Sequence, residues 1–160
     1  KGAKMIDLGT AVQRLCIHEG ISLTPYKCSA GYLTIGVGRN LITNPLTAEE
    51  KQKVGDWKSG ITKEAAFYLL RNDIIRTEKE CEQHIPFWKH LDDERQYALL
   101  DMAFNLGIKG LLQFKKMLND MGIGNYRGAA KECLNSKYAR DVGKRAERIA
   151  KTIETGKFVV

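Results

Sequence analysis

Residues 19–38 constrain the fold more than any other segment, because the residue pattern changes there from helical to extended. Thr10 and Gln13 form a capping-box pattern, and the apolar residues around it have helical spacing: Leu8, Val12, Leu15 and Cys16. The pattern predicts a first helix over about residues 11–18, with Glu19 at its end and Gly20 as the stop. Ser29-Ala30-Gly31 then forms a turn signal between two extended runs. We therefore predict a helix followed by a β-hairpin.

The alternation after the turn assigns side chains to faces of the hairpin. One face receives Leu33, Ile35 and Val37, and the other receives Tyr32, Thr34 and Gly36. Thr34 is therefore expected to face away from the buried side, and Tyr26 and Cys28 share a face of the first arm. If the hairpin folds back across the end of the first helix, then Glu19, Cys28 and Thr34 line one cleft.

Glu19 is placed where a carboxyl group keeps its proton. The unpaired carbonyl groups and the negative pole of a helix lie at its carboxyl end, and both favour a neutral carboxyl. That environment suits a general acid. The plainer alternative is a surface glutamate that ends a helix.

The composition is that of an ordinary globular chain of 160 residues, and its net charge of +7 favours an anionic partner. Charge alone does not choose between nucleic acid, a membrane surface and a cell-wall polymer. The apolar runs are too short for stable membrane insertion. No signal peptide is visible, and the chain shown starts at Lys1, so the export route is not visible in it.

The four cysteines include no Cys-x-x-Cys pair, and no histidines nearby complete a zinc set, so we expect no metal site. Cys16 and Cys133 are expected to be small buried hydrophobes. The sequence also contains no recognisable cofactor site.

Helical patterns dominate the rest of the chain. A pattern capped by Thr62 and running to about Gln83 gives a helix of about 30 Å, long enough to bridge two lobes. A second helix, from Asp92 or Asp93 to Leu106, is apolar on nearly every side. Its exceptions, Asp101 and Asn105, share a face and either reach solvent through a cleft or satisfy each other. Shorter helices are expected at about residues 47–57, 111–113, 115–121, 126–134 and 141–154.

Several motifs in register carry a family resemblance. Glu19, Cys28 and Thr34 are separated by eight and five residues, and an Ile-Gly-x-Gly run follows. Further along come Asp101-Met-Ala-Phe-Asn-Leu-Gly107, Phe114, and Arg145-Ala-x-Arg148 with Thr155-Gly156. This order and spacing resembles the T-even bacteriophage lysozyme family over roughly residues 8–157. The middle catalytic position of that family is Asp or, in some members, Cys.

The resemblance implies an α+β, mainly α fold, with a small N-terminal β-hairpin lobe joined by a long helix to a C-terminal helical lobe. Residues 1–160 would form a single lysozyme-like domain. Its parts would be a hairpin lobe over about 11–61, a connecting helix over 62–83 and a helical lobe over 84–160, against which the first helix packs. Arg39 and Asp73 match a pair in the family that ties the lobes. As a surface pair they would contribute at most about 1 kcal/mol.

The implied function is a peptidoglycan hydrolase, a muramidase that cleaves the β-1,4 bond between N-acetylmuramic acid and N-acetylglucosamine. The catalytic residues would be Glu19, Cys28 and Thr34. The family's substrate-binding positions match Tyr32, Leu33, Gly38, Phe104, Asn105, Phe114 and Arg145, and the arginine at the last of these lies near the catalytic glutamate. The implied partner is bacterial peptidoglycan, without nucleic acid, and the protein is expected to be a monomer. It would pass from the host cytoplasm to the cell wall or periplasm at lysis.

Cys28 leaves two mechanisms open. An ordinary thiol titrates near pH 8.5, so it is a poorer base than a carboxylate, although a cation such as Lys27 would raise the thiolate fraction. Cys28 either acts as a base or water-orienting group together with Thr34, or attacks the sugar as a nucleophile and retains its configuration. The resemblance favours inversion.

Two alternative functions belong to other classes. One is a catalytically silent cell-wall-binding module. The other is a basic helical nucleic-acid binder, with helix-turn-helix corners near Gly107 and Gly122. The second alternative leaves the hairpin unexplained.

Overall fold

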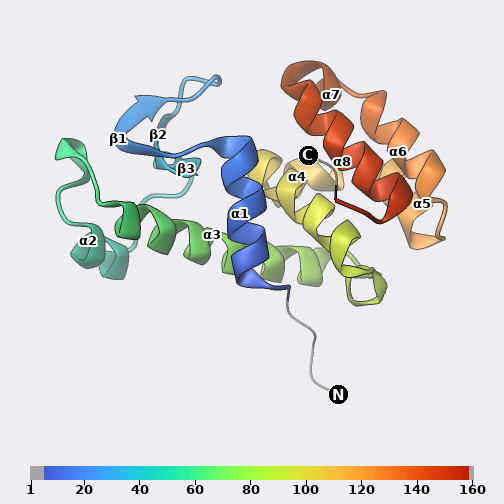
Figure 1. Ribbon diagram of the computed structural model, residues 1–160, viewed down its shortest axis with the longest axis horizontal. Coiled ribbons are helices and arrows are strands. Elements are labelled where there is room, and N and C mark those ends of the chain that lie inside the picture. Colours follow the sequence, from blue (N-terminus) through green and yellow to red (C-terminus); the bar gives the residue numbers. More distant parts are fainter. Residues whose placement is uncertain (1–5, 159–160) are drawn as a thin grey trace. The chain divides into compact units, whose positions relative to one another are not determined.

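The computed structural model describes residues 6–158. Helices make up most of this part, and a small three-stranded antiparallel sheet lies near its N-terminal end (Figure 1). This arrangement confirms the α+β, mainly α fold class. The chain divides into two compact units. We call residues 7–76 the hairpin unit, and residues 77–158 together with Ile6 the helical unit.

The hairpin unit holds the sheet and the amino-terminal helices. In chain order its elements are α1 (Leu8–Glu19), β1 (Ser22–Lys27), β2 (Leu33–Gly36), β3 (Arg39–Asn40), α2 (Ala48–Val54), the 3₁₀ turn η1 (Trp57–Ser59) and the first part of α3 (Lys63–His84). β1 follows α1 directly (Figure 1). We expected the first helix to pack with the helical lobe. In this division α1 belongs to the hairpin unit, and its packing against the helical lobe stays a prediction.

The start of α1 differs from the sequence prediction. The helix begins at Leu8, because the carboxylate of Asp7 is the N-cap and accepts hydrogen bonds from the Thr10 backbone N–H at 2.9 Å and the Thr10 hydroxyl at 2.7 Å. The predicted capping box at Thr10 is therefore wrong. Aspartate caps at least as well as threonine, and its use starts the helix about three residues earlier than predicted.

The sheet anchors the hairpin on α3. Ile35 is fully buried in a cluster with residues of α3 and the intervening loop: Leu41, Leu46, Ile61, Ala65, Ala66 and Leu69. Gly36 has a φ of 68°, and a Cβ atom there would lie 3.6 Å from Ala66 Cβ. That distance is ordinary van der Waals contact, so it is the positive φ that favours glycine at this position.

Thr34 corrects a second prediction. We expected Thr34 to face away from the buried side, but it is only 3% exposed, so the face of β2 that carries it is covered as well as the apolar face. The alternation separates the two faces of a strand, but it does not tell whether anything covers the polar one.

α3 begins close to the predicted position. The Thr62 hydroxyl accepts the Ala65 backbone N–H at 3.0 Å, as expected of an N-cap, and the helix runs over Lys63–His84. The boundary between the two units falls inside this helix, after Arg76.

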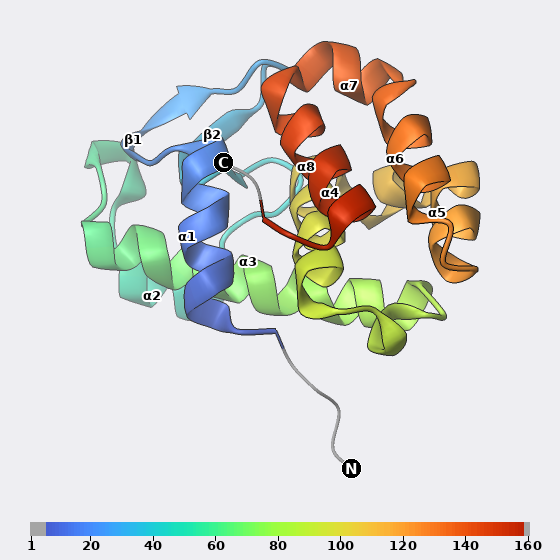
Figure 2. The ribbon, with the colours of Figure 1, turned by 45° about the vertical axis from the view of Figure 1, so that its right-hand side comes forward.

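The helical unit is built around α4. After the end of α3 come η2 (Trp88–His90), α4 (Asp93–Leu112), α5 (Lys115–Gly122), α6 (Tyr126–Leu134), α7 (Lys137–Val142) and α8 (Lys144–Thr155). α8 packs against α4 and α6, and α5 packs against α6 (Figure 2). Nearly every side of α4 before Gly107 is buried, which confirms its predicted central place.

Two glycines set helix boundaries in this unit. Gly107 leaves the helical conformation with φ 77° and ψ 159°, close to the predicted end at Leu106, but helical structure resumes well before residue 111. Gly143, with φ 57°, divides the helix predicted over 141–154 into α7 and α8. Ser136 caps α7 by accepting the Ala139 N–H at 3.1 Å, and this earlier start was missed.

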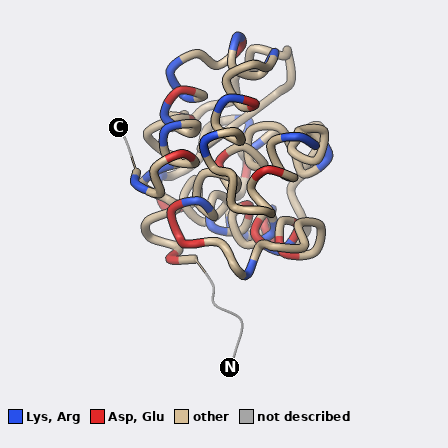
Figure 3. Tube along the Cα trace, turned by 90° about the vertical axis from the view of Figure 1, so that its right-hand side faces the viewer, with Lys and Arg blue, Asp and Glu red and all other residues tan. Residues whose placement is uncertain are grey.

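Charge and hydropathy add two observations. Lys and Arg residues are interspersed with Asp and Glu residues along the chain (Figure 3). Within residues 6–158, no helix combines the length and the apolar character needed to cross a membrane.

Candidate active site

Glu19 closes α1 at the entrance to the hairpin. The Gly20 N–H donates to the Cys16 carbonyl at 2.9 Å, and Gly20 adopts a φ of 71° that turns the chain toward β1. Glu19 is half-buried, as expected for a side chain at the last position of a helix that feeds directly into the sheet. Its predicted place at the end of the helix is confirmed.

Four side chains share one face of the hairpin, which we call the thiol face: Tyr26, Cys28, Tyr32 and Thr34. Tyr26 lies opposite Thr34 in the β1–β2 register. The pairing continues past β1, because the Cys28 N–H donates to the Tyr32 carbonyl at 2.9 Å. Since side chains alternate along paired strands, all four point to the same side of the hairpin.

The turn around Cys28 favours its thiolate. Burial raises the pKa of the Cys28 thiol, but backbone hydrogen bonds from Tyr32, Ala30 and Gly31 and a side-chain hydrogen bond with Thr34 outweigh burial and lower it below its ordinary value. Hydrogen bonds to a charged group stabilise its charged form. The cause is therefore the turn backbone and Thr34 rather than the Lys27 charge that the sequence suggested.

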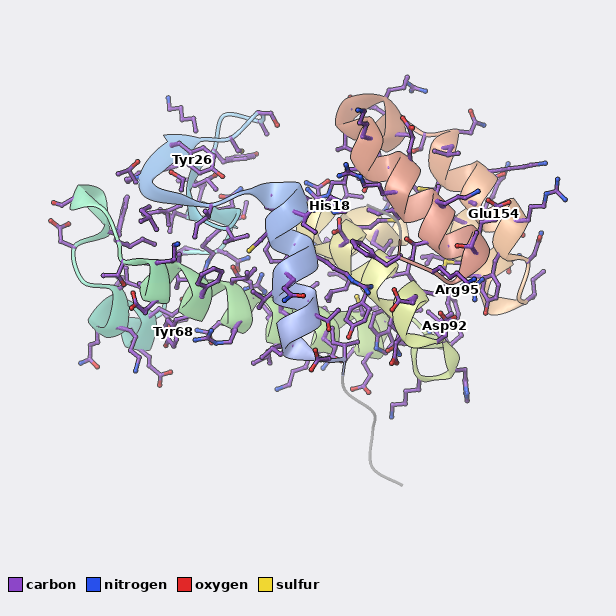
Figure 4. The ribbon with its side chains drawn as sticks, viewed as in Figure 1. His18, Tyr26, Tyr68, Asp92, Arg95 and Glu154 are labelled. Carbon is purple, nitrogen blue, oxygen red and sulfur yellow. The ribbon has the colours of Figure 1, made fainter. Side chains whose placement is uncertain are left out.

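Tyr26 connects the thiol face to Glu19. Partial burial, followed by the negative charges of Glu19 and Cys28, raises the pKa of the Tyr26 phenol. Such charge effects weaken over about 10 Å at physiological salt, so the carboxyl and the thiol both lie in the neighbourhood of this phenol. Tyr26 lies on β1 (Figure 4). Sequence reasoning placed Tyr26 on the same face as Cys28 but gave it no role.

The remaining thiols differ from Cys28. All four cysteines are free. Burial raises the pKa of Cys81 and of Cys133 to about 12, with the charges of Glu80 and Glu78 adding to the effect at Cys81. Cys133 is buried as predicted, whereas Cys16 is only half-buried. Among residues 6–158, no three His, Cys, Asp or Glu side chains gather where they would hold a metal ion.

Arg39 joins a buried network inside the hairpin unit. Its Nη1 lies 3.2 Å from Asp73 Oδ1, and its Nη2 lies 2.6 Å from Glu50 Oε1. The three side chains are at most 5% exposed, so this is a buried network and not the surface pair that we expected. Asn72 Nδ2 also donates to Glu50 Oε2, at 3.0 Å. Glu50 was not predicted, because nothing in its local sequence distinguishes it from a surface helix residue.

This network predicts acid sensitivity of the fold. Burial alone would raise the pKa of Glu50, but hydrogen bonds from Arg39 and Asn72 lower it from 4.5 to about 2. A carboxyl group with a depressed pKa contributes stability that is present above pH 4.5 and is lost as the pH falls through 2, here about 3 kcal/mol. Urea unfolding of the wild type should show this loss, and Glu50→Gln should flatten the curve between these pH values. Equal pH slopes for both proteins would contradict the assignment. Burial raises the pKa of Asp73, so this group makes stability increase as the pH falls, and it does so in the wild type and in the Glu50→Gln variant alike.

The predicted residues of the helical unit have different surroundings. Arg145 Nε donates to Asp101 Oδ1 at 2.8 Å, and both side chains are at most 10% exposed. Asp101 is thus paired with Arg145 of α8, while Asn105 is exposed on the same helix. Phe104 is half-buried.

Phe114 lines a cavity of about 650 Å³ in the same unit. Its ring meets Tyr138 edge to face, with ring centroids 5.9 Å apart. The other lining residues are Leu106, Gln113, Lys115, Lys116, Met117, Glu132, Asn135, Ser136, Lys137, Tyr138 and Asp141. Phe104 and Asn105 are not among them.

The three hairpin residues that were matched to substrate positions are accessible to different degrees. Tyr32 is 43% exposed, and Leu33 and Gly38 are half-buried. The hairpin unit therefore carries Glu19, Cys28, Thr34 and these three positions. Phe104, Asn105, Phe114 and Arg145 belong to the helical unit.

Comparison with known proteins places this chain in the class of lysozyme-like cell-wall hydrolases. The chain is 32% identical over 153 residues to probable T4-type lysozyme 1 of Dictyostelium discoideum, covering 86% of this chain and 89% of that protein. It is 29% identical over 128 residues to an endolysin of Acyrthosiphon pisum secondary endosymbiont phage 1, covering 80% and 77%. It is also 29% identical over 151 residues to the pre-baseplate central spike protein Gp5 of Enterobacteria phage T4. That match covers 86% of this chain but only 26% of the spike protein.

The model of the phage lysozyme family matches residues 17–151, and the chain belongs to this family. The match includes Glu19, Cys28 and Thr34 as well as the motifs from Asp101 to Arg148. Membership supports lysozyme activity as a glycoside hydrolase.

Proposed function

We propose that this protein is a muramidase that cleaves the β-1,4 bond between N-acetylmuramic acid and N-acetylglucosamine in bacterial peptidoglycan. The observation that carries the proposal is the arrangement around Tyr26. The negative charges of Glu19 and Cys28 both raise the pKa of the Tyr26 phenol, and Tyr26 is paired with Thr34 in the hairpin. A carboxyl group and a thiol with a neighbouring hydroxyl are thus gathered on one unit of a chain that belongs to the phage lysozyme family.

The proposed reaction uses Glu19 as the general acid. Its carboxyl group donates a proton to the glycosidic oxygen as the bond to the sugar C1 breaks. A water molecule attacks C1 from the opposite face and loses its proton to the Cys28 thiolate, which inverts the configuration. The hydrogen bond between Thr34 and Cys28 supports a shared role, in which the hydroxyl orients this water.

The alternative role of Cys28 is nucleophilic attack at C1, which retains configuration through a thioglycoside intermediate. The lowered thiol pKa increases the thiolate fraction in either mechanism, so it does not separate them. We favour inversion because the family resemblance implies it, and the Thr34 hydroxyl beside the thiol supports a shared hold on a water molecule.

Substrate contacts are proposed at the positions matched to the family. On the hairpin unit these are Tyr32, Leu33 and Gly38, where the exposed Tyr32 ring offers a surface to a sugar. On the helical unit they are Phe104, Asn105, Phe114 and Arg145. Two observations support this second group: Phe114 lines the 650 Å³ cavity, and the Asp101 ion pair holds the Arg145 guanidinium in a fixed position.

The place of action follows from the same proposal. A monomer synthesised in the host cytoplasm would reach the cell wall or periplasm at lysis, as the similarity to a phage endolysin supports. Purified peptidoglycan should therefore release reducing ends when the protein is added. A protein that binds the polymer without releasing reducing ends would be the silent binding module instead.

Substitution of Cys28 tests its role directly. Cys28→Ala should lower kcat about a hundredfold, because a general base contributes about two to four orders of magnitude. Cys28→Asp should stay active and should keep its activity to lower pH, since a carboxylate is ionised at pH values where a thiol is protonated. Initial rates of reducing-end release from pH 4 to 9 measure both effects. Wild-type rates in the Ala variant would remove Cys28 from the mechanism.

A further inference from the structure

We propose that Tyr26 is a positioning residue, whose hydroxyl group donates a hydrogen bond to the attacking water opposite Glu19. This inference rests on the proposed muramidase activity and adds a third group to the Cys28–Thr34 pair. Tyr26 is absent from the set of residues that the sequence motifs identified.

The hairpin register places Tyr26 beside the proposed water site. Tyr26 and Thr34 are directly opposite each other on β1 and β2. Side chains in such a pair have Cβ atoms about 4.5–5.5 Å apart and stand on the same face. Cys28 follows two residues after Tyr26, and the backbone hydrogen bond from Cys28 to Tyr32 keeps it in the same alternation. A group held by Thr34 and Cys28 is therefore within reach of a tyrosine ring.

The charges around Tyr26 keep it a donor. The groups that act on it are Glu19 from the end of α1 and Cys28 from the turn, and both disfavour a negatively charged phenolate. Because the pKa of the phenol is raised while that of the Cys28 thiol is lowered, the phenol keeps its proton at pH values where the thiol ionises. A neutral hydroxyl can donate a hydrogen bond to water without adding a third negative charge to the site.

The hydroxyl is also available for this role. Burial and the two charges raise the pKa of Tyr26, and no hydrogen bond within residues 6–158 contributes to that shift. Thr34, in contrast, already donates its hydroxyl proton to the Tyr32 carbonyl at 2.8 Å. A hydroxyl has a single proton to donate, and the Tyr32 carbonyl and the Cys28 thiolate already compete for it, so Thr34 offers a water molecule only an acceptor. Tyr26 supplies the donor that this arrangement otherwise lacks.

Tyr26→Phe tests the inference, because it removes the hydroxyl and keeps the ring. We expect kcat to fall about tenfold, the effect of one hydrogen bond in the transition state, and KM to change less than twofold. Tyr68→Phe is the matched control: Tyr68 is a half-buried tyrosine on α3 of the same unit, and its ring lies under Lys53 Nζ (Figure 4). This control should leave both constants unchanged.

A second measurement separates positioning from distortion of the hairpin. The alkylation rate of Cys28 against pH, followed by mass spectrometry, reports the hydrogen bonds of the turn, and it should be the same in wild type and Tyr26→Phe. A lower kcat with a shifted alkylation profile would mean a disturbed turn and would overturn the inference, as would an unchanged kcat. Absence of activity in the wild type would instead overturn the proposed function.

Discussion

Glu19→Gln should lower the release of reducing ends from purified peptidoglycan by about a thousandfold. The amide has nearly the same shape as the carboxyl group but has no acidic proton to give the leaving oxygen, and general acid catalysis contributes about two to four orders of magnitude. Binding of the variant to the insoluble polymer should persist, because only the transition state loses an interaction. Measurement of reducing ends and of polymer binding on the same samples distinguishes these effects.

A matched control is available in the same unit. Glu49 is an exposed residue in the first turn of α2, and Glu49→Gln changes the net charge by the same amount. We expect this variant to keep full activity, and both variants to unfold at nearly the wild-type temperature. Full turnover by Glu19→Gln would end the proposed mechanism.

Arg39→Met should cause the largest loss of stability, about 3–5 kcal/mol. The substitution removes the cation that faces Glu50 and Asp73, and it leaves two buried carboxyl groups without their main partner. For a chain of this size the loss corresponds to a fall in Tm of about 10 °C. Urea unfolding at pH 7 gives the free energy directly.

Arg76→Met is the matched control for that experiment. Arg76 also pairs with Asp73, at 2.8 Å, but its side chain is 39% exposed. An exposed pair contributes about 1 kcal/mol or less, so this variant should be close to wild type. If the two substitutions lowered the free energy of unfolding equally, burial would not determine how much an ion pair of this network contributes to stability.

Helix and turn positions were predicted correctly where the local sequence contained only one suitable capping or turn signal. The predicted helix over 126–134 coincides with α6, which Asn125 caps and Asn135 ends. Thr62 was found as the start of α3 because a threonine at the edge of a long helical pattern leaves few alternatives. The turn at Ser29-Ala30-Gly31 likewise located the hairpin.

Predictions were wrong where two local signals competed, or where the outcome depended on contacts between residues distant in the sequence. Asp7 and Thr10 were both acceptable caps, and the structure uses Asp7. The glycine at 143 lay inside an otherwise convincing amphipathic pattern, yet its positive φ splits the helix. The burial of Thr34 and the pairing of Glu50 with Arg39 depend on segments distant in sequence, which periodicity does not reveal.

The candidate site was predicted mainly by family resemblance. The spacing of Glu19, Cys28 and Thr34 identified them, while the turn hydrogen bonds that favour the Cys28 thiolate required coordinates. Tyr26 was overlooked, although its position two residues before Cys28 was a usable signal. On a paired strand that spacing places both side chains on the same face.

The most direct test of the account is the anomeric configuration of the first products from purified peptidoglycan, followed by proton NMR before mutarotation. The account predicts new N-acetylmuramic acid reducing ends that appear first as the α anomer, because water attacks the β-linked C1 from the face opposite the proton donor. Products that appear first as the β anomer would contradict inversion. A polymer that gains no reducing ends at all would contradict the assignment of Glu19, Cys28 and Thr34 as a hydrolytic site.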